Sequence, residues 1–387
     1  MRRAYKFLLR PTSKQVDALT ACVEDHRQLY NAALQERRDA YRRAGVSIRY
    51  GDQSVQLKDI RRYDPDQGRW SFSSQQATLR RLETAFAAFF RRVKAGRAPG
   101  YPRFKGIGWF DTVEWPKDRD GCRWDSTPDD LTRVYLQGVG HVRVHAHRTV
   151  EGTVKTISVK REGRRWYVVL SCGDVPELVL AETGSAVGID MGIASFLTTS
   201  DGAQISNPRH GRRNAERLAA AQRDLARKKR GSNRRRKARE RVAAHHARVR
   251  RRRLDHAHKA ALWLVRHYDI IAHEDLRIAN MTRSASGTVE VPGANVAQKS
   301  GLNRSILDAG WGVFLNVLAS KAESAGRVVV AVNPANTSRT CPDCGHCAKE
   351  NRVTQADFVC VACGYAGHAD VVGATNVLGA GLALLDA

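Results

Sequence analysis

Apolar residues near the N-terminus recur at helical spacing. Between Thr12 and Arg97, the segments SKQVDALTACVEDHRQLYNAALQERRDAYRRAG and SSQQATLRRLETAFAAFFRRVKAG each begin at a serine-containing cap and end at a glycine. Serine side chains cap the free amides of a helix start, and glycine favours a helix end, so this pattern predicts two helical segments. A polar connection rich in Asp, Gln and Arg joins them.

Short runs of β-type residues follow a stretch rich in Gly and Pro, RAPGYPRFKGIGWFDTVEWP. The runs RVYLQG, HVRVHAH and TVKTISVKREGRRWYVVLSC are separated by turn residues, which predicts a small β-barrel or sandwich. The opening segment RAYKFLLR also alternates as a strand does. We therefore expect the helices to be an insertion between the first strand and the remaining ones.

From about Gly184 onward, strand patterns alternate with helix patterns. A strand runs to Asp190, a second strand follows a turn, and a proline-free, arginine-rich stretch from Arg209 to His267 predicts helix with one break at RGSNRRR. After it come a strand in DIIAHEDL, a polar loop in SASGTVEVPGAN, a helix in WGVFLNVLASKAESAG, a strand in RVVVAVNP and a closing helix in HADVVGATNVLGAGLALL. This alternation predicts an α/β domain.

The charge balance indicates a polyanionic partner. The chain has 387 residues and a formal net charge of +26, so nucleic acid is the first candidate. Its arginine-rich segments contain too few acids for ion pairing at i,i+4 spacing. We expect Arg234, Arg235 and Arg236 to lie along a nucleic-acid backbone, the alternative being a solvated helix face.

Length and hydropathy limit the class of protein further. With 42% hydrophobic residues the chain can bury sizeable cores, and its length favours two or three domains. The apolar run in MRRAYKFLLRPTSKQ is too short for a signal peptide, and no apolar stretch could span a bilayer. We expect a cytoplasmic, nucleoid-associated protein of a prokaryote, without a membrane partner.

Three carboxylates occupy comparable positions in the second half of the chain. Asp190 ends an apolar strand, Glu274 ends another after YDIIAH, and Asp370 opens the last helix. Strand ends and the adjoining helix starts converge at one edge of an α/β sheet, so the three acids can meet there. Crowded carboxylates need a cation such as Mg²⁺ or Mn²⁺, and two ions roughly 3.5–4 Å apart would support phosphodiester hydrolysis. Taken singly, each acid is more simply an ordinary cap or a solvated strand-end residue.

Five of the eight cysteines crowd one segment, CPDCGHCAKENRVTQADFVCVACG. Two Cys-x-x-Cys-Gly knuckles supply four thiolates for a structural, tetrahedral zinc, and each glycine permits a tight turn. The predicted ligands are Cys341, Cys344, Cys360 and Cys363. Cys347 is the ambiguous residue because it forms a second, overlapping Cys-x-x-Cys pair with Cys344, although only Cys344 is followed by glycine.

The motifs around the three acids resemble a known family. GIDMGIASFLTTSDG, IAHEDLRIANM and HADVVGATNVL are similar to the catalytic motifs of a RuvC-like, ribonuclease H-fold nuclease, and their order around a cysteine ribbon resembles the TnpB family. TnpB proteins are RNA-guided DNA endonucleases encoded by insertion sequences and related to type V CRISPR effectors. The resemblance continues through AYKFLLRPTSKQ, LYNAAL, APGYPRFKG, KKRGSN and NPANTSRTCPDCG.

This resemblance implies a site, partners and cofactors. Asp190, Glu274 and Asp370 would be the catalytic, magnesium-binding acids. The partners would be a guide RNA derived from the transposon end and double-stranded target DNA, with one protein monomer per RNA or a dimer as the alternative. The last motif departs from many relatives, which have an acidic-basic-acidic run followed by an asparagine, because His368 and Ala369 precede Asp370 here and Val372 follows it. That departure bears on rate and metal preference.

The resemblance also implies a multidomain α/β and β architecture. A β-barrel wedge would comprise residues 1–10 and 105–182, with a helical recognition domain, 11–104, inserted into it. The RuvC-like domain would comprise 183–340 and 364–387, with the zinc ribbon, 341–363, inserted. The N-terminal half would read a short motif that flanks the target and bind the RNA, and the C-terminal half would cut.

Aromatic and basic residues interleave before the first predicted β run. Tyr101, Phe104 and Trp109 stand near Arg103 and Lys105, followed by Phe110 and Trp115, as on a base-stacking surface. Tyr101 and Lys105 are therefore candidate nucleic-acid contacts, although core packing is the alternative for most of the aromatic residues. Arg339 in NTSRTC is a further candidate, for a phosphate contact, or else a solvated residue.

Two functions from other classes compete with RNA-guided cleavage. One is an RNA-guided DNA-binding repressor without cleavage, which the three intact acids argue against. The other is a transposase that joins DNA ends by strand transfer, and the acids alone do not exclude it.

Overall fold

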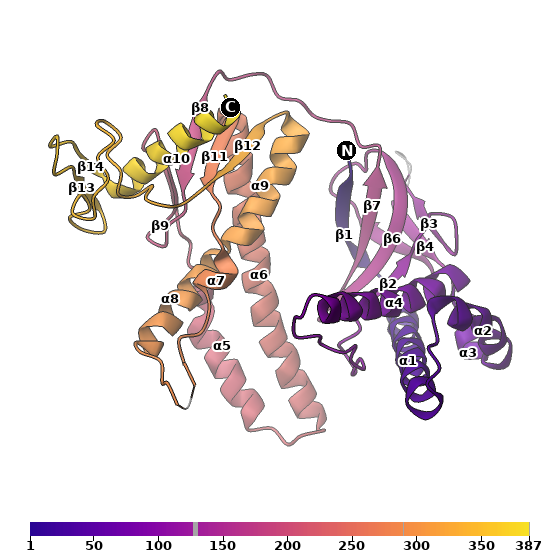
Figure 1. Cartoon of the computed structure of the whole chain (residues 1–387). Coiled ribbons are helices and arrows are strands. Elements are labelled where there is room, and N and C mark those ends of the chain that lie inside the picture. The colour runs from indigo at the N-terminus through magenta and orange to yellow at the C-terminus, as the bar shows by residue number, and fades with distance from the viewer. Residues whose placement is uncertain (127–130, 289, 387) are drawn as a thin grey trace. The chain divides into compact units, whose positions relative to one another are not determined.

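The computed structural model describes residues 1–126, 131–288 and 290–386, and it divides into two compact units, Met1–Pro176 and Glu177–Ala387 (Figure 1). Each unit has a hydrophobic core of its own. Residues 127–130 of the predicted wedge and residues 289 and 387 of the predicted nuclease domain lie outside the described residues.

The first unit contains a seven-stranded antiparallel sheet with the order β2-β6-β7-β1-β5-β4-β3. The strands are β1 (Arg3–Arg10), β2 (Thr112–Trp115), β3 (Cys122–Asp125), β4 (Arg133–Leu136), β5 (Gly140–His145), β6 (Thr153–Glu162) and β7 (Arg165–Gly173). Strand β1 pairs with both β7 and β5, so the first ten residues belong to the sheet formed by the later ones. This confirms that the helices are an insertion after the first strand.

The sheet is curled but open. In the described part of the chain its hydrogen-bonded order ends at β2 on one side and at β3 on the other, and no pairing joins these two edges into a barrel. Alternate residues of β1, namely Tyr5, Phe7 and Leu9, are buried, as expected for a strand with one face on a core.

Four helices follow β1: α1 (Ser13–Ala44), α2 (Tyr50–Tyr63), α3 (Pro65–Gly68) and α4 (Phe72–Lys94). Thr12 caps α1 in a reciprocal capping box with Gln15, and Ser71 caps α4. The connection predicted to be only polar therefore contains two further helices. Leu19 of α1, Leu79 of α4 and Phe7 of β1 belong to one continuous core, so the helices and the sheet are stabilised together.

The second unit contains a five-stranded sheet with the order β10-β9-β8-β11-β12. Its strands are β8 (Ala186–Asp190), β9 (Ser195–Thr199), β10 (Gln204–Ser206), β11 (Ile270–Glu274) and β12 (Val328–Val332). Strands β8, β11 and β12 run parallel, whereas β9 and β10 are antiparallel neighbours at one edge. With its helices this sheet forms the α/β unit that the alternating pattern predicts.

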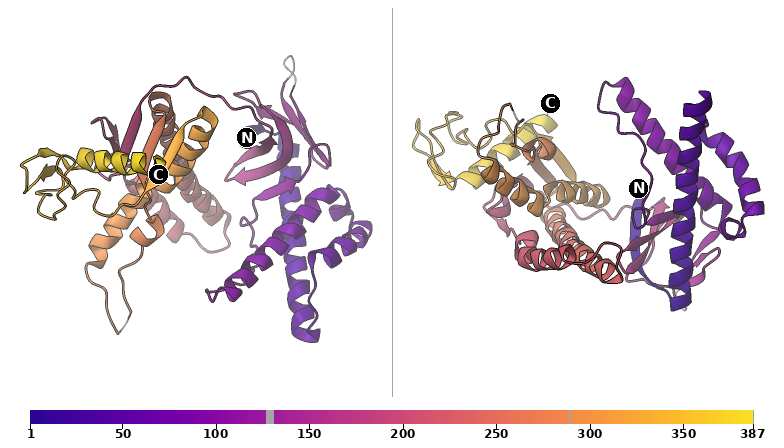
Figure 2. Two further views of the ribbon diagram at one scale, coloured as in Figure 1. Left: turned by 45° about the horizontal axis from the view of Figure 1, so that its top comes forward. Right: turned by 90° about the horizontal axis from the view of Figure 1, so that it is seen from below.

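The helices of the second unit are α5 (His210–Ala226), α6 (Asn233–His267), α7 (Ile278–Met281), α8 (Val296–Ala309), α9 (Trp311–Ala325) and α10 (Ala369–Leu385). Helices α5 and α6 form a hairpin whose turn coincides with the predicted break (Figure 2). Ile271 of β11 belongs to the core that includes α6 and α9, while the next residue, Ala272, packs with Val377 of α10. Since successive strand residues point to opposite faces, α10 covers the other face of the sheet.

The segment after Pro176 is built onto the second unit. Backbone amides of Leu178 and Leu180 donate to the end of α9, at Ser324 and Ala325. The carboxylate of Asp269 accepts from the amides of Thr183 and Gly184 and pairs at 2.6 Å with the buried guanidinium of Arg327. No helix in the described residues is long and apolar enough to cross a membrane.

Candidate active site and zinc-binding ribbon

Helix α10 lies unusually close to strands β8 and β11. A Cβ added to Gly188 of β8 would lie 2.0 Å from the carbonyl oxygen of Ala374, and one added to Gly381 would lie 2.5 Å from Cβ of Ala272. No side chain fits at either position, so both glycines are required by the packing. Near the start of the helix a Cβ on Gly373 would lie 3.6 Å from Oδ2 of Asp190, which places the N-terminal part of α10 against the end of β8.

In this packing Glu274 and Asp370 lie close enough to Asp190 for their charges to act on it. Burial, together with the charges of Glu274 and Asp370, raises the pKa of Asp190 to about 7. The guanidinium of Arg352 opposes this rise in pKa but does not cancel it. A half-buried carboxylate near two others is held at a free-energy cost that a bound cation would relieve.

The three carboxylates do not form a single compact ligand set. The four cysteines of the ribbon have ligand atoms within 4.8 Å of one another, but the described residues contain no such group that includes Asp190, Glu274 and Asp370. The residue types nevertheless suit a hard cation, because carboxylate oxygens are the ligands that Mg²⁺ and Mn²⁺ prefer.

Glu274 is oriented by the loop that follows β12. The hydroxyl of Thr337 donates to Oε1 of Glu274 at 2.6 Å, and Thr337 is buried. The side-chain amide of Asn376, on α10, donates to the carbonyl oxygens of Thr337 and Thr340, both at 2.7 Å. Asn376 therefore joins the helix of Asp370 to the loop that positions Glu274.

Two further side chains adjoin Asp370. The guanidinium of Arg352, which comes from the ribbon, lies 4.0 Å from Oδ1 of Asp370 and is partly shielded from solvent. His368, the residue at which the last motif departs from many relatives, is the N-cap of α10: its Nδ1 accepts from the amide of Asp370 at 3.2 Å. This departure thus places a capping group two residues before the acid.

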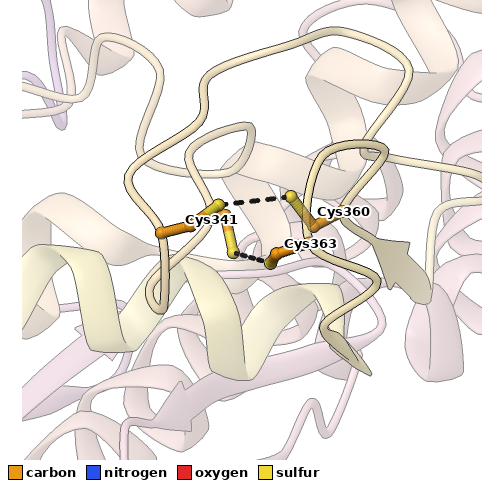
Figure 3. A group of neighbouring side chains, drawn as sticks. Cys341, Cys360 and Cys363 are labelled. Atoms are coloured by element: carbon orange, nitrogen blue, oxygen red, sulfur yellow. Dashed lines mark hydrogen bonds between the residues drawn. The ribbon is translucent and has the colours of Figure 1, made fainter.

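The cysteine ribbon brings together the four predicted zinc ligands. The sulfurs of Cys341 and Cys363 are 3.7 Å apart, and those of Cys344 and Cys360 are 3.6 Å apart (Figure 3). Tetrahedral zinc with Zn–S bonds of about 2.3 Å requires sulfurs roughly 3.8 Å apart, so the set fits the ion. Cys347 is exposed and lies outside this cluster, which favours the four predicted ligands over a set that includes Cys347.

The two knuckles repeat the same backbone geometry. Gly345 and Gly364 have φ values of 73° and 79°, in the left-handed region that glycine tolerates. Each glycine amide donates to the carbonyl oxygen of the first cysteine in its knuckle. The distance is 3.0 Å from Gly345 to Cys341 and 2.9 Å from Gly364 to Cys360. Hydrogen bonds from the backbone amides of Cys363 and Ala362 lower the pKa of Cys360 to about 6, which favours the thiolate that binds metal.

Buried Asn351 connects the knuckles to the approach loop. Its side-chain amide donates to the carbonyl oxygens of Arg339 and His346, and its Oδ1 accepts from the amide of Val361. Because Arg352 is the next residue, the fold of the ribbon determines where the guanidinium beside Asp370 lies.

The arginines predicted to contact nucleic acid differ in the contacts that they make within the protein. Arg234 is exposed and Arg236 pairs with Glu240 at 3.2 Å, but Nη1 of Arg235 donates to the carbonyl oxygens of Leu225 and Lys228, both at 2.9 Å. Arg235 therefore has a structural contact at the α5–α6 turn. Arg339 is exposed.

Among the interleaved aromatic residues, Phe110 and Trp115 are buried in the core, whereas Tyr101, Phe104 and Trp109 are exposed. The ammonium of Lys105 lies over the ring of Tyr30, 5.6 Å from its centroid. Core packing thus accounts for Phe110 and Trp115. The nucleic-acid role of Tyr101 and Lys105 stays a prediction.

Sequence reasoning missed Arg352, Thr337 and Asn376. Their contacts join loops and helices that lie far apart in the chain, and hydrophobic periodicity carries no signal for them. Asn376 ends HADVVGATN, so the asparagine in the last motif of the resembling family was the one available indication.

Three family models match parts of this chain. Family models match residues 170–285 (OrfB_IS605, described as "Probable transposase"), residues 311–377 ("Cas12f1-like, TNB domain") and residues 1–45 ("Helix-turn-helix domain"). In the structure residues 1–45 form strand β1 and the single long helix α1.

Two relatives match along almost their whole length. "Putative RNA-guided DNA endonuclease InsQ" of Escherichia coli (strain K12) is 36% identical over 385 residues, which cover 99% of this chain and 93% of the relative. A "Putative RNA-guided DNA endonuclease" of Streptomyces pristinaespiralis is 33% identical over 391 residues, which cover 99% of this chain and 90% of the relative. A solved Cas12f1–sgRNA–target DNA complex contains a chain with a TM-score of 0.55 and 15% identity, covering 95% of this chain and 83% of that one, which shows a shared fold.

Proposed function

Because the chain belongs to the TnpB family, we propose that it is an RNA-guided DNA endonuclease, associated with an insertion sequence, that hydrolyses target DNA at the Asp190 site. The single observation that carries the proposal is that the charges of Glu274 and Asp370 act on the half-buried carboxylate of Asp190, whose pKa is raised to about 7 by burial and by these two charges. Such a site is costly in the free protein, and divalent cations would offset that cost.

The chain's own residues have distinct roles in this proposal. Asp190, Glu274 and Asp370 would hold Mg²⁺ or Mn²⁺, which when bound activates water and stabilises the leaving oxygen of a phosphodiester. Thr337 keeps Glu274 oriented through its hydroxyl, and Asn376 keeps Thr337 against α10. Arg352 lies where it can neutralise a phosphate oxygen next to Asp370.

The finer assignments are also part of the proposal. Zinc at Cys341, Cys344, Cys360 and Cys363 would be structural, because four protein thiolates leave no open position for catalysis. The first unit would read the motif that flanks the target, and the guide RNA would come from the transposon end. The exposed arginines of the α5–α6 hairpin would lie along the nucleic acid.

In the deciding experiment, the protein is expressed from its native locus and purified together with the RNA bound to it. The bound RNA is sequenced, and double-stranded DNA that matches its variable end is offered with Mg²⁺. We expect cleavage of the matched DNA, and its loss in Asp190→Asn, Glu274→Gln and Asp370→Asn, with RNA binding nearly unchanged. Asp255→Asn removes an exposed acid on α6 and serves as the control that should still cut.

The products separate this function from its alternatives. Hydrolysis leaves free DNA ends, whereas a strand-transfer transposase, which the description of the matched 170–285 model suggests, would join the ends to a second duplex. Binding of matched DNA without cleavage under Mg²⁺ and Mn²⁺ would identify a repressor and contradict the proposal.

A further inference from the structure

A pocket lined by aromatic and arginine side chains lies in the first unit. It has a volume of about 530 Å³ and is formed between the C-terminal part of α1 and the loop that follows α4. The polar and aromatic residues that line it are Arg38, Tyr41, Arg42, Tyr101, Arg103 and Phe104. Its volume is within the range of small-ligand sites, which is about 300–1,000 Å³.

The loop that forms one wall is held at both of its ends. The guanidinium of Arg92 donates to the carbonyl oxygen of Pro99 at 3.1 Å. At the other end, the side chain of Asn31 pairs with both backbone groups of Lys105, accepting from its amide at 2.8 Å and donating to its carbonyl oxygen at 2.9 Å. Arg27 donates to the same carbonyl oxygen. The wall is therefore a built surface rather than a free loop.

The ring of Tyr101 is positioned by α4. It meets Phe86 and Phe89 edge-on, with ring centroids 5.6 Å and 5.3 Å away, and yet 45% of the residue is exposed. Phe104 and Tyr41 are 43% and 66% exposed. Three aromatic side chains thus leave ring surface exposed around this pocket. Burying these rings in the core would stabilise the fold more than leaving them exposed does.

The charges around the pocket have one sign. Arg38, Arg42 and Arg103 make no ion pair with an acid among the residues that the structure describes. Exposed aromatic rings stack on the faces of nucleobases, and guanidinium groups without an acidic partner bind phosphate. A pocket with both kinds of group therefore suits a nucleotide whose base is not paired. A duplex buries its base faces in stacking and could offer this pocket only its backbone.

We propose that this pocket binds an unpaired nucleotide of the guide RNA, with the base stacked on Tyr41 or Phe104 and the phosphate held by the arginines. The inference rests on the proposed function, and it adds a specific RNA-binding site. The RNA is favoured over the target DNA because exposed aromatic surface is a liability for a free protein, so a resident partner covers it better than a transient one.

The first test locates the contact in the full-length protein purified with its RNA. Ultraviolet irradiation followed by digestion and mass spectrometry is expected to find ribonucleotide adducts on the peptides that contain Tyr41, or Tyr101 and Phe104. Adducts on other aromatic residues, with none on these peptides, would overturn the assignment.

The second test measures affinity with a defined probe, a fluorescein-labelled ten-nucleotide oligouridylate. Loss of one stacking contact in Tyr41→Ala or Phe104→Ala should weaken binding about 5- to 150-fold, and this ratio should persist at raised salt because stacking is not a counterion effect. Tyr41→Phe keeps the ring and should bind as the unchanged protein does, whereas Tyr41→Leu keeps the apolar volume but should bind as weakly as Tyr41→Ala.

Tyr63 provides the matched control. It is 80% exposed at the end of α2 with the guanidinium of Arg62 over its ring, 6.0 Å from the centroid, but it does not line the pocket. Tyr63→Ala should not change the affinity for the probe. Equal losses of affinity in Tyr63→Ala and Tyr41→Ala would show that RNA binds the surface generally and not this pocket.

The outcomes also separate this inference from the proposed function. If the protein carries RNA and cuts matched DNA but Tyr41→Ala and Phe104→Ala bind the probe normally, the pocket assignment alone is wrong. If a single-stranded oligothymidylate depends on Tyr41 and oligouridylate does not, the pocket binds DNA and the RNA assignment is overturned. A protein that carries no RNA at all contradicts the proposed function.

Discussion

The side-chain amide of Asn376 donates to the carbonyl oxygen of Thr337 at 2.7 Å, and through this bond the helix that carries Asp370 holds the loop that orients Glu274. Two of the three acids at the candidate site therefore depend on one contact that includes neither of them. Their relative position is a property of the fold around them.

Replacing Asn376 should test that dependence. In Asn376→Ala the carbonyl oxygens of Thr337 and Thr340 lose their donor, and we expect cleavage to fall about 10- to 100-fold, as for other residues that orient metal ligands. Single-turnover rates measured across a series of Mg²⁺ concentrations should show a higher concentration at half-maximal rate, while RNA affinity stays constant. Thr375→Ala, next to it on α10, is the control; a loss of equal size there would point to general damage to the helix.

Removing the charge of Asp190 should stabilise the protein without metal while abolishing cleavage. The raised pKa of Asp190 means that its carboxylate is held at a free-energy cost, because of burial and of the charges of Glu274 and Asp370. In EDTA, Asp190→Asn should therefore melt at a higher temperature than the unchanged protein. Added Mg²⁺ should raise the melting temperature of the unchanged protein only, and a Mg²⁺ response of the same size in Asp190→Asn would exclude this carboxylate as a ligand.

The zinc ligands can be distinguished within one chain. Cys341→Ser should lose most of the bound zinc, which we expect at about one equivalent and resistant to mild chelation, and Cys347→Ser should retain it because Cys347 lies outside the sulfur cluster. Elemental analysis of the purified variants measures this directly. Cleavage should also fall in Cys341→Ser, since the ribbon positions Arg352 beside Asp370. Zinc lost from Cys347→Ser and kept by Cys341→Ser would reverse the assignment.

The arginines at the α5–α6 turn should divide into two kinds. Arg234→Gln should reduce the slope of log affinity against log salt concentration by about 0.7–0.9, the value of one phosphate contact. Arg235→Gln removes the donor to Leu225 and Lys228, so its main effect should be a lower melting temperature. Titrations of RNA binding at several salt concentrations measure the slopes, and an unchanged slope for Arg234→Gln would make it a solvated residue.

Acid should destabilise the second unit partly through Asp308. Burial would raise the pKa of Asp308, but the amides of Gly211 and Arg212 and the guanidinium of Arg253 outweigh it and hold the pKa below its ordinary value. Because the folded pKa is the lower one, this stabilisation is present above the unfolded pKa, near 4, and is lost as pH falls through the folded value.

Asp308→Asn should therefore cost about 2 kcal/mol of unfolding free energy near neutral pH, as expected for hydrogen bonds to a charged group. The difference from the unchanged protein should shrink as pH falls below about 4. Denaturant melts at a series of pH values give both quantities. A difference that stays constant down to the lowest pH would show that the carboxylate charge is not what stabilises the start of α5.

Hydrophobic patterning predicted the elements that bury a clear apolar face. Strands β8, β11 and β12 and helices α9 and α10 lie where their patterns indicated, because each packs apolar residues against the sheet. Helices α2 and α8 were missed for the opposite reason. In α2 only Gln53 and Leu57 are buried, and in α8 only Ile306 and Ala309, so neither has an apolar stripe to detect.

The sequence predicted those residues of the candidate site whose type and local position indicate a chemical role. Asp190 and Glu274 were found as strand-end acids, and the knuckle cysteines were found by spacing. Arg352 could not be found, because it reaches Asp370 only once the ribbon folds around Asn351. Spacing alone could not separate Cys347 from the predicted ligands, because only the folded ribbon shows that it lies outside the sulfur cluster.

The close contact of α10 with the sheet has a consequence for how this protein tolerates random mutation. Gly381 lies eleven residues after Asp370, which is about 16 Å along a helix, yet a single methyl group there would have to push α10 away from Ala272. A deep mutational scan that selects for DNA cutting should therefore reject every substitution at Gly188 and Gly381 as strongly as changes to the acids. Positions without any side chain would then stand among the most constrained in the chain, although they offer a substrate nothing to touch.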